Sequence, residues 1–289
     1  MNTSIESNRS LDRIISSMGD LPASPAIVST LMSQTTDSAA DLEKICRTLM
    51  ADQSLTARLL KLSNSSFYGR AKEVSTLREA ILILGFKTLR SLVLAASTHS
   101  LYKNCGESEV TEKLWEHTLA VAIASRFIAE EIGHPQIEEA FIAGLMHDIG
   151  KLVMIEKIHD DYSEIIQTVE NSQSNFVDEE KSRLSFTHAD VGLLLLNKWA
   201  FPPALANAVF EHHHPTGLNQ SPTPLGVIVN LANFVGKNLC QGFDDFRLPD
   251  PSLLPSAVAL NLDAARLEDI QNRTAERFVS EQELYLAGA

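Results

Sequence analysis

Hydrophobic residues recur along the chain with helical spacing. Leu42, Ile45, Cys46 and Leu49 occur at i, i+3, i+4 and i+7, which is the pattern of one buried helix face. No stretch alternates apolar and polar residues between hairpin turns, so the pattern predicts no β-strands. The sequence therefore predicts an all-α protein.

Glycine, proline and capping residues divide the predicted helices. Prolines on both sides of Ser24 favour a helix start there, and Gly85 separates a helix that ends at Leu84 from one that begins at Phe86. The segment Asn64–Gly69 follows a leucine-rich helix, and its Asn and Ser residues favour a helix cap and turn over a ligand site. Further helices are predicted over residues 110–132, 135–149 (with Gly150 as the stop), 161–172, 186–199, 203–212, 225–242 and 262–286, with loops at 214–224 and 242–255.

Composition narrows the class of protein. The 289 residues are 44% hydrophobic and 21% charged, which is typical of a globular chain that can bury a large core. The formal net charge of −13 disfavours a broad surface for nucleic acid or anionic membranes. The three cysteines lack a C-x-x-C spacing, and the chain shows neither a secretory signal nor an apolar run that could cross a bilayer. We expect a cytoplasmic protein with reduced thiols.

The histidines are the candidate chemistry. His147 and Asp148 are adjacent at a predicted helix end, and imidazole with carboxylate suits zinc, iron, manganese or nickel. His117 lies within an apolar helix, His188 opens another helix, and His212–His214 form a run at the end of a third. A metal site needs ligands from distant chain positions, which a helical bundle can bring together.

A purely structural role is the alternative for each of these residues. His117 would then be a hydrogen-bonded core histidine, and the run at 212–214 a solvated helix end whose charge favours the helix dipole. His99, His134 and His159 stand beside polar residues or helix ends and are predicted to be ordinary surface positions.

Several motifs resemble the HDOD domain of the HD superfamily. The N-terminal half contains LPASPAIVSTLM, DLEKICRTLMADQSLTARLLKLSNSSFYG and VSTLREAILILGFKTLRSLVLAAS, and LMHDIGK is similar to the motif that names the superfamily. The resemblance extends from Leu21 to Lys237 and implies a multi-helix bundle of HD-domain type with an N-terminal HDOD-specific subdomain. The implied units are an N-terminal segment (1–20), the HDOD subdomain (21–105), an HD-like core (106–241), and a loop with the C-terminal helix (242–289).

The extra histidines resemble those of the HD-GYP branch, which hydrolyses cyclic di-GMP with two or three metal ions. By this resemblance, Lys151 stands where that branch keeps a lysine near the substrate phosphate, and Asn233 replaces the last aspartate ligand. The resemblance implies iron, manganese or zinc as the metal. The implied metal-binding residues are His117, His147, Asp148, His188, His213, His214 and Asn233.

Three departures from the HD-GYP pattern predict a degenerate site. Asn233 offers a neutral carbonyl where an anion is expected, which weakens metal affinity. Lys113 stands where the branch has a glutamate, and the residues after His214 do not read Gly-Tyr-Pro. A working cyclic di-GMP phosphodiesterase is therefore not expected.

The resemblance implies a non-catalytic regulatory module of bacterial signal transduction. Its expected partner is a signalling protein, such as a response regulator or a second-messenger enzyme. Binding to nucleic acid or to a membrane is not expected. A metal-dependent phosphohydrolase acting on a nucleotide or cyclic dinucleotide is the alternative, and binding of a metal or nucleotide without turnover is a third hypothesis. The acidic C-terminal helix either caps the fold or forms a homodimer.

Overall fold

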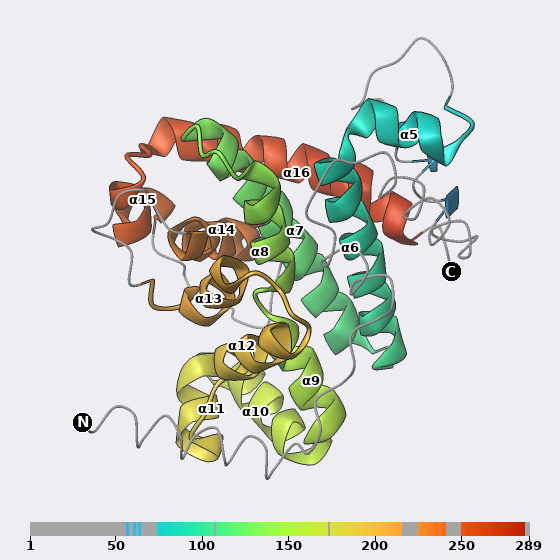
Figure 1. Cartoon of the computed structure of the whole chain (residues 1–289). Helices are drawn as coiled ribbons and strands as arrows, with labels where there is room; N and C mark the ends of the chain where they lie inside the picture. The colour runs from blue at the N-terminus through green and yellow to red at the C-terminus, as the bar shows by residue number, and fades with distance from the viewer. Residues whose placement is uncertain are drawn as a thin grey trace.

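The computed structural model describes residues 74–106, 108–172, 174–215, 225–240 and 250–286, together with isolated positions between 56 and 64. No strand occurs among these residues, and nearly all of them are helical, which confirms the all-α prediction (Figure 1). The helix starts predicted near Ser24 and Leu42 lie outside the described residues, as do positions 216–224 of the predicted loop. The predicted domain boundaries stay predictions.

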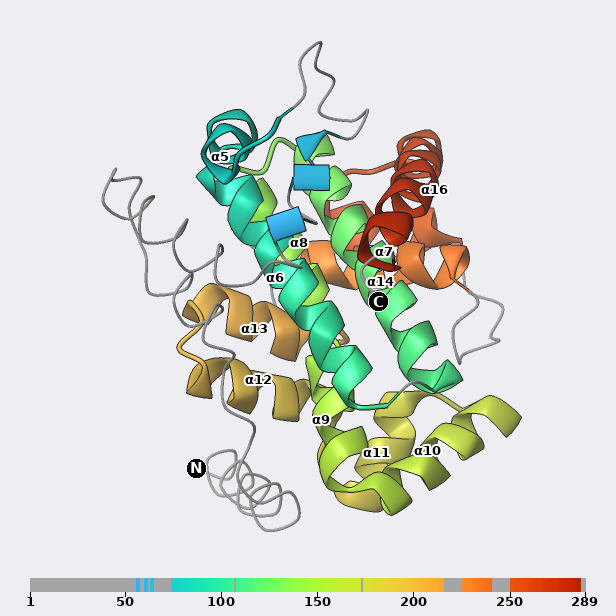
Figure 2. The ribbon, with the colours of Figure 1, turned by 90° about the vertical axis from the view of Figure 1, so that its right-hand side faces the viewer.

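Helix α7 (Glu109–Glu131) is the centre of the bundle, and residues on most of its faces are buried. It begins at a capping box, in which the Ser108 side chain accepts from the backbone N–H of Thr111 and the Thr111 hydroxyl accepts from that of Ser108. Helices from both ends of the described chain pack on it, as Figures 1 and 2 show. They are α6 (Phe86–Asn104), α8 (Ile137–Met146), α14 (Leu225–Leu239) and α16 (Ala264–Leu286).

The described end of the N-terminal half matches its sequence signals. Gly85 has φ +76° and separates α5 (Leu77–Leu84) from α6, as predicted. The Asn64 side chain donates to the carbonyl of Leu60 and exchanges two hydrogen bonds with the backbone of Val74. At this residue, the helix-cap interpretation is confirmed.

The remaining helices build one end of the molecule. Helix α12 packs on α9 and α13, and α13 packs in turn on α8 and α14. Helices α10 and α11 form a hairpin at the lower end of Figures 1 and 2. Their bounds are α9 Ile149–Lys157, α10 His159–Asn171, α11 Phe176–Leu184, α12 His188–Lys198 and α13 Pro203–Glu211.

The predicted helix over 135–149 is wrong at its end. Helix α8 ends at Met146, and Gly150 lies in the first turn of α9, so it does not terminate a helix. A methyl group at Gly150 would overlap the carbonyl oxygen of His188 and lie 3.0 Å from the backbone nitrogen of Gly192. Glycine is needed here because α9 packs directly on the backbone of α12.

The C-terminal helix caps the bundle. Arg273 of α16 lies 3.1 Å from Glu130 and holds its guanidinium over the ring of Phe127, and Arg266 pairs with Glu131 at the end of α7. The short elements before it are η2 (Pro251–Leu253) and α15 (Pro255–Ala259). Among the described residues, no helix is long and apolar enough to span a bilayer.

The surface prediction for His99 is wrong. Its side chain is buried in α6, with its ring centroid 4.7 Å from that of Trp115 on α7. The exposed His159 and the half-buried His134 lie away from this contact.

Candidate metal centre

Five helices bring one aspartate and five histidines together. His117 extends from α7, His147 and Asp148 form the link between α8 and α9, and His188 is the first residue of α12. Two more residues come from the segment that follows α13. We refer to the following six residues as the histidine cluster: His117, His147, Asp148, His188, His212 and His213.

Asp148 lies at the centre of the histidine cluster and faces a different set of rings with each oxygen. Its Oδ2 is 3.2 Å from His147 Nε2 and 3.9 Å from His117 Nε2. Its Oδ1 is 3.3 Å from His188 Nε2 and 3.7 Å from His212 Nε2. The cluster therefore contains two overlapping groups of metal-binding size that share Asp148. They are His117–His147–Asp148 and Asp148–His188–His212–His213.

Backbone carbonyls fix the orientation of two rings. His147 Nδ1 donates to the carbonyl of Gly144 at 2.8 Å, and His212 Nδ1 donates to that of Val209 at 2.6 Å. A proton on Nδ1 leaves a lone pair on Nε2, and in both rings Nε2 is the atom that faces Asp148. This is the tautomer in which a histidine binds metal through Nε2.

A buried carboxylate has the same effect on His188. Its Nδ1 lies 2.7 Å from Oε2 of Glu180, and its backbone N–H donates to the same oxygen at 2.9 Å. Histidine ligands of protein-bound metals are commonly held in this way by a carboxylate on the other ring nitrogen. With Nδ1 protonated, His188 Nε2 also presents a lone pair, 2.9 Å from His213 Nε2.

The unpaired atoms of the cluster fit a metal ion. His147 Nε2 and Asp148 Oδ1 are buried and form no hydrogen bond, although each has an ion-pairing group within 3.3 Å. Asn233 Oδ1, on α14, is a third buried oxygen without a hydrogen bond. Buried lone pairs without a hydrogen-bond donor or a cation are costly in a protein interior. A metal ion shared by these atoms would remove that cost. Nitrogen and carboxylate donors of this kind suit zinc, iron or manganese.

The pKa shifts in the cluster favour neutral imidazole at three histidines and an ionised Asp148. Burial lowers the pKa of His117, His212 and His213 well below the usual histidine value, and repulsion from neighbouring histidines lowers it further. Burial alone would raise the pKa of Asp148, but His147 and Lys151 hold it well below its ordinary value. Neutral imidazole and ionised carboxylate are the forms that bind metals.

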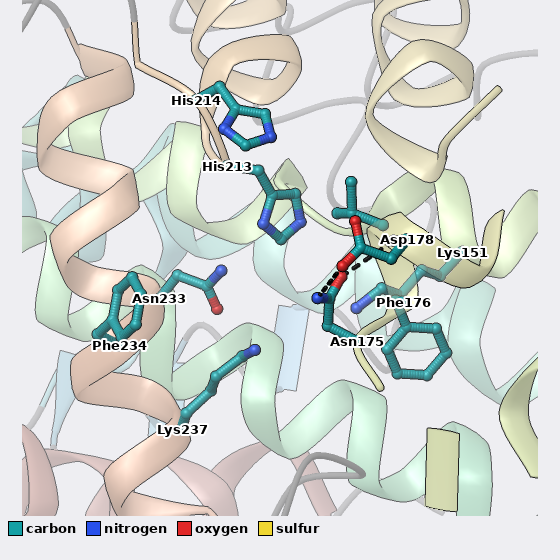
Figure 3. Close-up of a pocket in the computed structure, with 10 residues that line it drawn as sticks. Lys151, Asn175, Phe176, Asp178, His213, His214, Asn233, Phe234 and Lys237 are labelled. Atoms are coloured by element: carbon teal, nitrogen blue, oxygen red, sulfur yellow. Dashed lines mark hydrogen bonds between the residues drawn. The ribbon is translucent and has the colours of Figure 1, made fainter. Parts of the chain in front are cut away.

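A pocket of about 320 Å³ opens beside the cluster (Figure 3). Lys151 and Lys237 extend into it from opposite sides, Asn233 lies on the same side as Lys237 on α14, and His213 belongs to both the pocket and the cluster. The ring of Phe176 forms part of its wall, 4.3 Å below the Lys151 ammonium. Two lysines and an aromatic ring suit an anionic ligand with a flat group, such as a nucleotide.

The structure brings together most of the residues predicted to bind metal. His117, His147, Asp148, His188 and His213 lie in the cluster, and Asn233 lines the adjoining pocket. His214 is exposed and lines the pocket outside both groups, whereas His212, which was not assigned as a ligand, lies fully buried within the second group. The helix ends at Glu211, so the direction of each ring in the run depends on local turns that helical periodicity does not describe.

The two lysines discussed in the sequence have different surroundings from each other. The Lys151 ammonium lies 2.8 Å from Asp148 Oδ2, so it is bound to the cluster as well as open to the pocket. Lys113 pairs with Glu109 one turn earlier in α7, at 2.7 Å, and its charge is balanced there.

Comparison with known proteins assigns most of the sequence to a family. The HDOD domain model matches residues 21–215. An uncharacterized protein of Treponema pallidum is 23% identical over 217 residues, which are 74% of this chain and 42% of that protein. The chain thus spans less than half the length of this relative.

Solved structures share the fold. An HDOD domain protein of unknown function from Geobacter sulfurreducens matches with a TM-score of 0.79 at 24% identity, over 99% of this chain and 98% of that one. A Shewanella amazonensis protein named "Putative phosphohydrolase" matches with a TM-score of 0.72 at 25% identity, over 96% and 98%. A Marinobacter aquaeolei protein named "Putative signal transduction protein" matches with a TM-score of 0.69 at 18% identity, over 98% and 65%.

Proposed function

Because the chain belongs to the HDOD family, we propose that it is a regulatory signal-transduction module that holds one divalent metal ion in the histidine cluster. Metal and an anionic ligand in the adjoining pocket shift the affinity of the module for a signalling protein, such as a response regulator or a second-messenger enzyme. The module acts in the cytoplasm without catalysing a reaction.

The position of Lys151 is the observation that carries this proposal. Its ammonium lies 2.8 Å from Asp148 Oδ2, the oxygen that faces His117 and His147. A metal ion in that group would share its carboxylate oxygen with a cation of the protein itself. The other oxygen, Oδ1, faces His188 and His212 and has no such competitor, so the second group supports one metal.

The residues around the second group favour binding of an anion over catalysis. A divalent ion in the second group would polarise a phosphate oxygen as a Lewis acid. Lys237 and Lys151 would hold the anion, and His213 would face it from the cluster. Asn233 adds a neutral oxygen where the related hydrolases are expected to have a second carboxylate, so the charge needed to bind a second cation is missing.

Metal content tests the proposal. Protein purified without a histidine tag or chelator should contain close to one atom of iron, manganese or zinc per chain, measured by elemental analysis. The double variant His188→Ala/His212→Ala should lose this metal, and His159→Ala, which removes an exposed histidine outside the cluster, should keep it. A metal content near zero after incubation of the wild type with all three metals would overturn the proposal.

The signalling role has a separate test. Immobilised wild-type protein should retain a signalling protein at physiological salt, in an amount that changes when metal is removed. The same double variant should retain a constant amount. If the wild type retains no protein specifically, with or without metal, the regulatory role is wrong even where metal binds.

A metal-dependent phosphohydrolase is the second candidate function. It is favoured by His213 and Lys151, which belong to both the cluster and the pocket, so an anion in the pocket would lie against the metal-binding residues. Asn233→Asp restores the missing carboxylate and should raise hydrolysis of bis(p-nitrophenyl) phosphate or cyclic di-GMP in the presence of manganese. If this variant with manganese leaves both substrates intact, the enzymatic function is excluded.

A further inference from the structure

Glu180 is a buried carboxylate whose hydrogen bonds link three helices. It lies in α11 with no exposed surface and accepts from three donors. Its Oε1 accepts from the hydroxyl of Tyr162 on α10 at 2.7 Å, and its Oε2 accepts from the backbone and ring N–H groups of His188 on α12. A buried carboxylate is stable only when its oxygens are satisfied in this way.

The bond from His188 makes Glu180 sensitive to the cluster. A cation on Nε2 of an imidazole withdraws electrons from the ring and makes the Nδ1–H a stronger donor. The hydrogen bond from Nδ1 to Glu180 therefore becomes stronger when His188 Nε2 binds metal. A ring with no cation on Nε2 is the weaker donor.

Helix α11 also forms part of the pocket wall. Asn175 caps its first turn by accepting from the backbone N–H of Asp178, and both residues line the pocket with Phe176 (Figure 3). The ring of Tyr162 stacks on that of Phe176, with centroids 6.3 Å apart. Burial, and then the Glu180 carboxylate, raises the pKa of Tyr162 well above its usual value, so its hydroxyl remains a donor.

We infer that Glu180 is a positioning residue that couples metal at the histidine cluster to the position of α11, and through α11 to the shape of the anion pocket. This inference rests on the metal binding proposed above. Because coupling between two sites is reciprocal, an anion that orders α11 would also tighten metal binding by the same factor.

The neighbouring glutamate provides a matched control. Glu179 has the same chemistry one residue earlier, but it is partly exposed and pairs with Arg183 at 3.5 Å on the outer face of α11. Glu179→Gln and Glu180→Gln each remove one charge from the same turn of the same helix. Only Glu180→Gln alters the acceptor of the His188 ring. The glutamine side chain has one oxygen and one NH₂ group, so its NH₂ group would face at least one of the groups that now donate to Glu180.

Hydrogen exchange of the full chain tests the coupling, with zinc or manganese alone as the probe. In the wild type, metal should slow exchange of the backbone amides of residues 176–184 by about 5- to 150-fold, the usual range for coupled sites. In Glu179→Gln the slowing should persist. In Glu180→Gln it should disappear, and metal affinity measured by titration against a chelator should fall by about 10- to 100-fold.

The outcomes separate this inference from the proposed function. If the wild type binds no metal, both are wrong. If metal binds and α11 exchange is unchanged, or if Glu180→Gln retains the full slowing, the coupling alone is wrong. Should Glu180→Gln fail to fold, Tyr162→Phe replaces it. This variant removes the hydrogen bond that the Tyr162 hydroxyl donates to Glu180, and it should reduce the slowing of exchange by metal. A response equal to that of the wild type would overturn the inference.

Discussion

Replacing Gly150 with alanine tests whether the contact between α9 and α12 sets the geometry of the histidine cluster. The added methyl group would overlap the carbonyl oxygen of His188, and would lie 2.8 Å from its carbonyl carbon and 3.0 Å from the nitrogen of Gly192. All three atoms belong to the backbone, so no change of side-chain rotamer can relieve the overlap. The two helices must move apart.

The size of the effect follows from these contacts. Relief to ordinary contact distance requires a separation of about 1 Å or more, and even a 0.5–1 Å gap forfeits about a quarter to a half of each van der Waals contact across it. Overpacking of this kind costs about 1–3 kcal/mol, and the better helix propensity of alanine offsets about 1 kcal/mol. Because backbone atoms cannot yield, we expect the upper end: a net loss of about 2 kcal/mol, or about 4–8 °C in Tm.

Metal binding should suffer more than stability. Asp148 precedes Gly150 in the same turn and His188 begins α12, so the separation acts directly on the 3.3 Å distance between Asp148 Oδ1 and His188 Nε2. Loss of a residue that merely orients a ligand costs about 10- to 100-fold in affinity, and displacement of a ligand should cost at least as much. Differential scanning calorimetry and chelator-competition titration of Gly150→Ala measure the two effects.

Gly226→Ala is the matched control. Gly226 also lies in a helix of the bundle, but a methyl group there would meet Cβ and Oε2 of Glu211 at 3.2 Å, a contact that a shift of a few tenths of an ångström relieves. We expect a change in Tm of less than about 2 °C and unchanged metal affinity. If Gly150→Ala also behaved in this way, the argument that the α9–α12 contact fixes the cluster would be refuted.

Three further predictions follow from the described contacts. Metal-free protein should lose stability to urea between pH 7.5 and 5.5, by up to about 1.4 kcal/mol per pH unit for each histidine that only the unfolded chain protonates; an unchanged midpoint would contradict the lowered pKa values. Arg273→Ala should cost about 1 kcal/mol through its contacts with α7, and Arg183→Ala, an exposed pair, less than about 0.5 kcal/mol; equal costs in denaturant titrations would contradict this. Burial, and then Glu116, raises the pKa of Cys240 to about 12, so iodoacetamide should modify it far more slowly in the folded protein than in urea at pH 8.

The sequence was sufficient for the helical architecture and for most of the cluster. Long apolar stretches bounded by helix-end signals located helices such as α7 and α14, because a helix buried on most faces is apolar around most of its circumference. The HD motif located Asp148. Gly150 was misinterpreted as a helix stop because glycine has two roles, a local one at helix ends and a tertiary one at close contacts, and a single sequence does not distinguish them.

Residues that act through tertiary contacts could not be predicted. Helix α11 is polar along most of its length, and no helix was predicted there, although acidic residues in its first turn and basic residues in its last favour one. Glu179 and Glu180 are identical residues in a charged run, and only the positions of Tyr162 and His188 make the second one buried and functional. In the same way, His212 and His214 differ by the turn at the end of α13, which propensity does not fix.

The ammonium of Lys151 at Asp148 has a consequence for how the protein can exist without metal. Many small metalloproteins unfold when their ion is removed, because nothing else compensates the ligand charges. Here the chain supplies its own counter-ion, and carbonyls and a carboxylate hold the rings from behind. We therefore expect the chain to fold before it takes up metal, so that the metal-free protein is itself a native state. On the proposed function, such a molecule would report the supply of a metal instead of needing that metal for its fold.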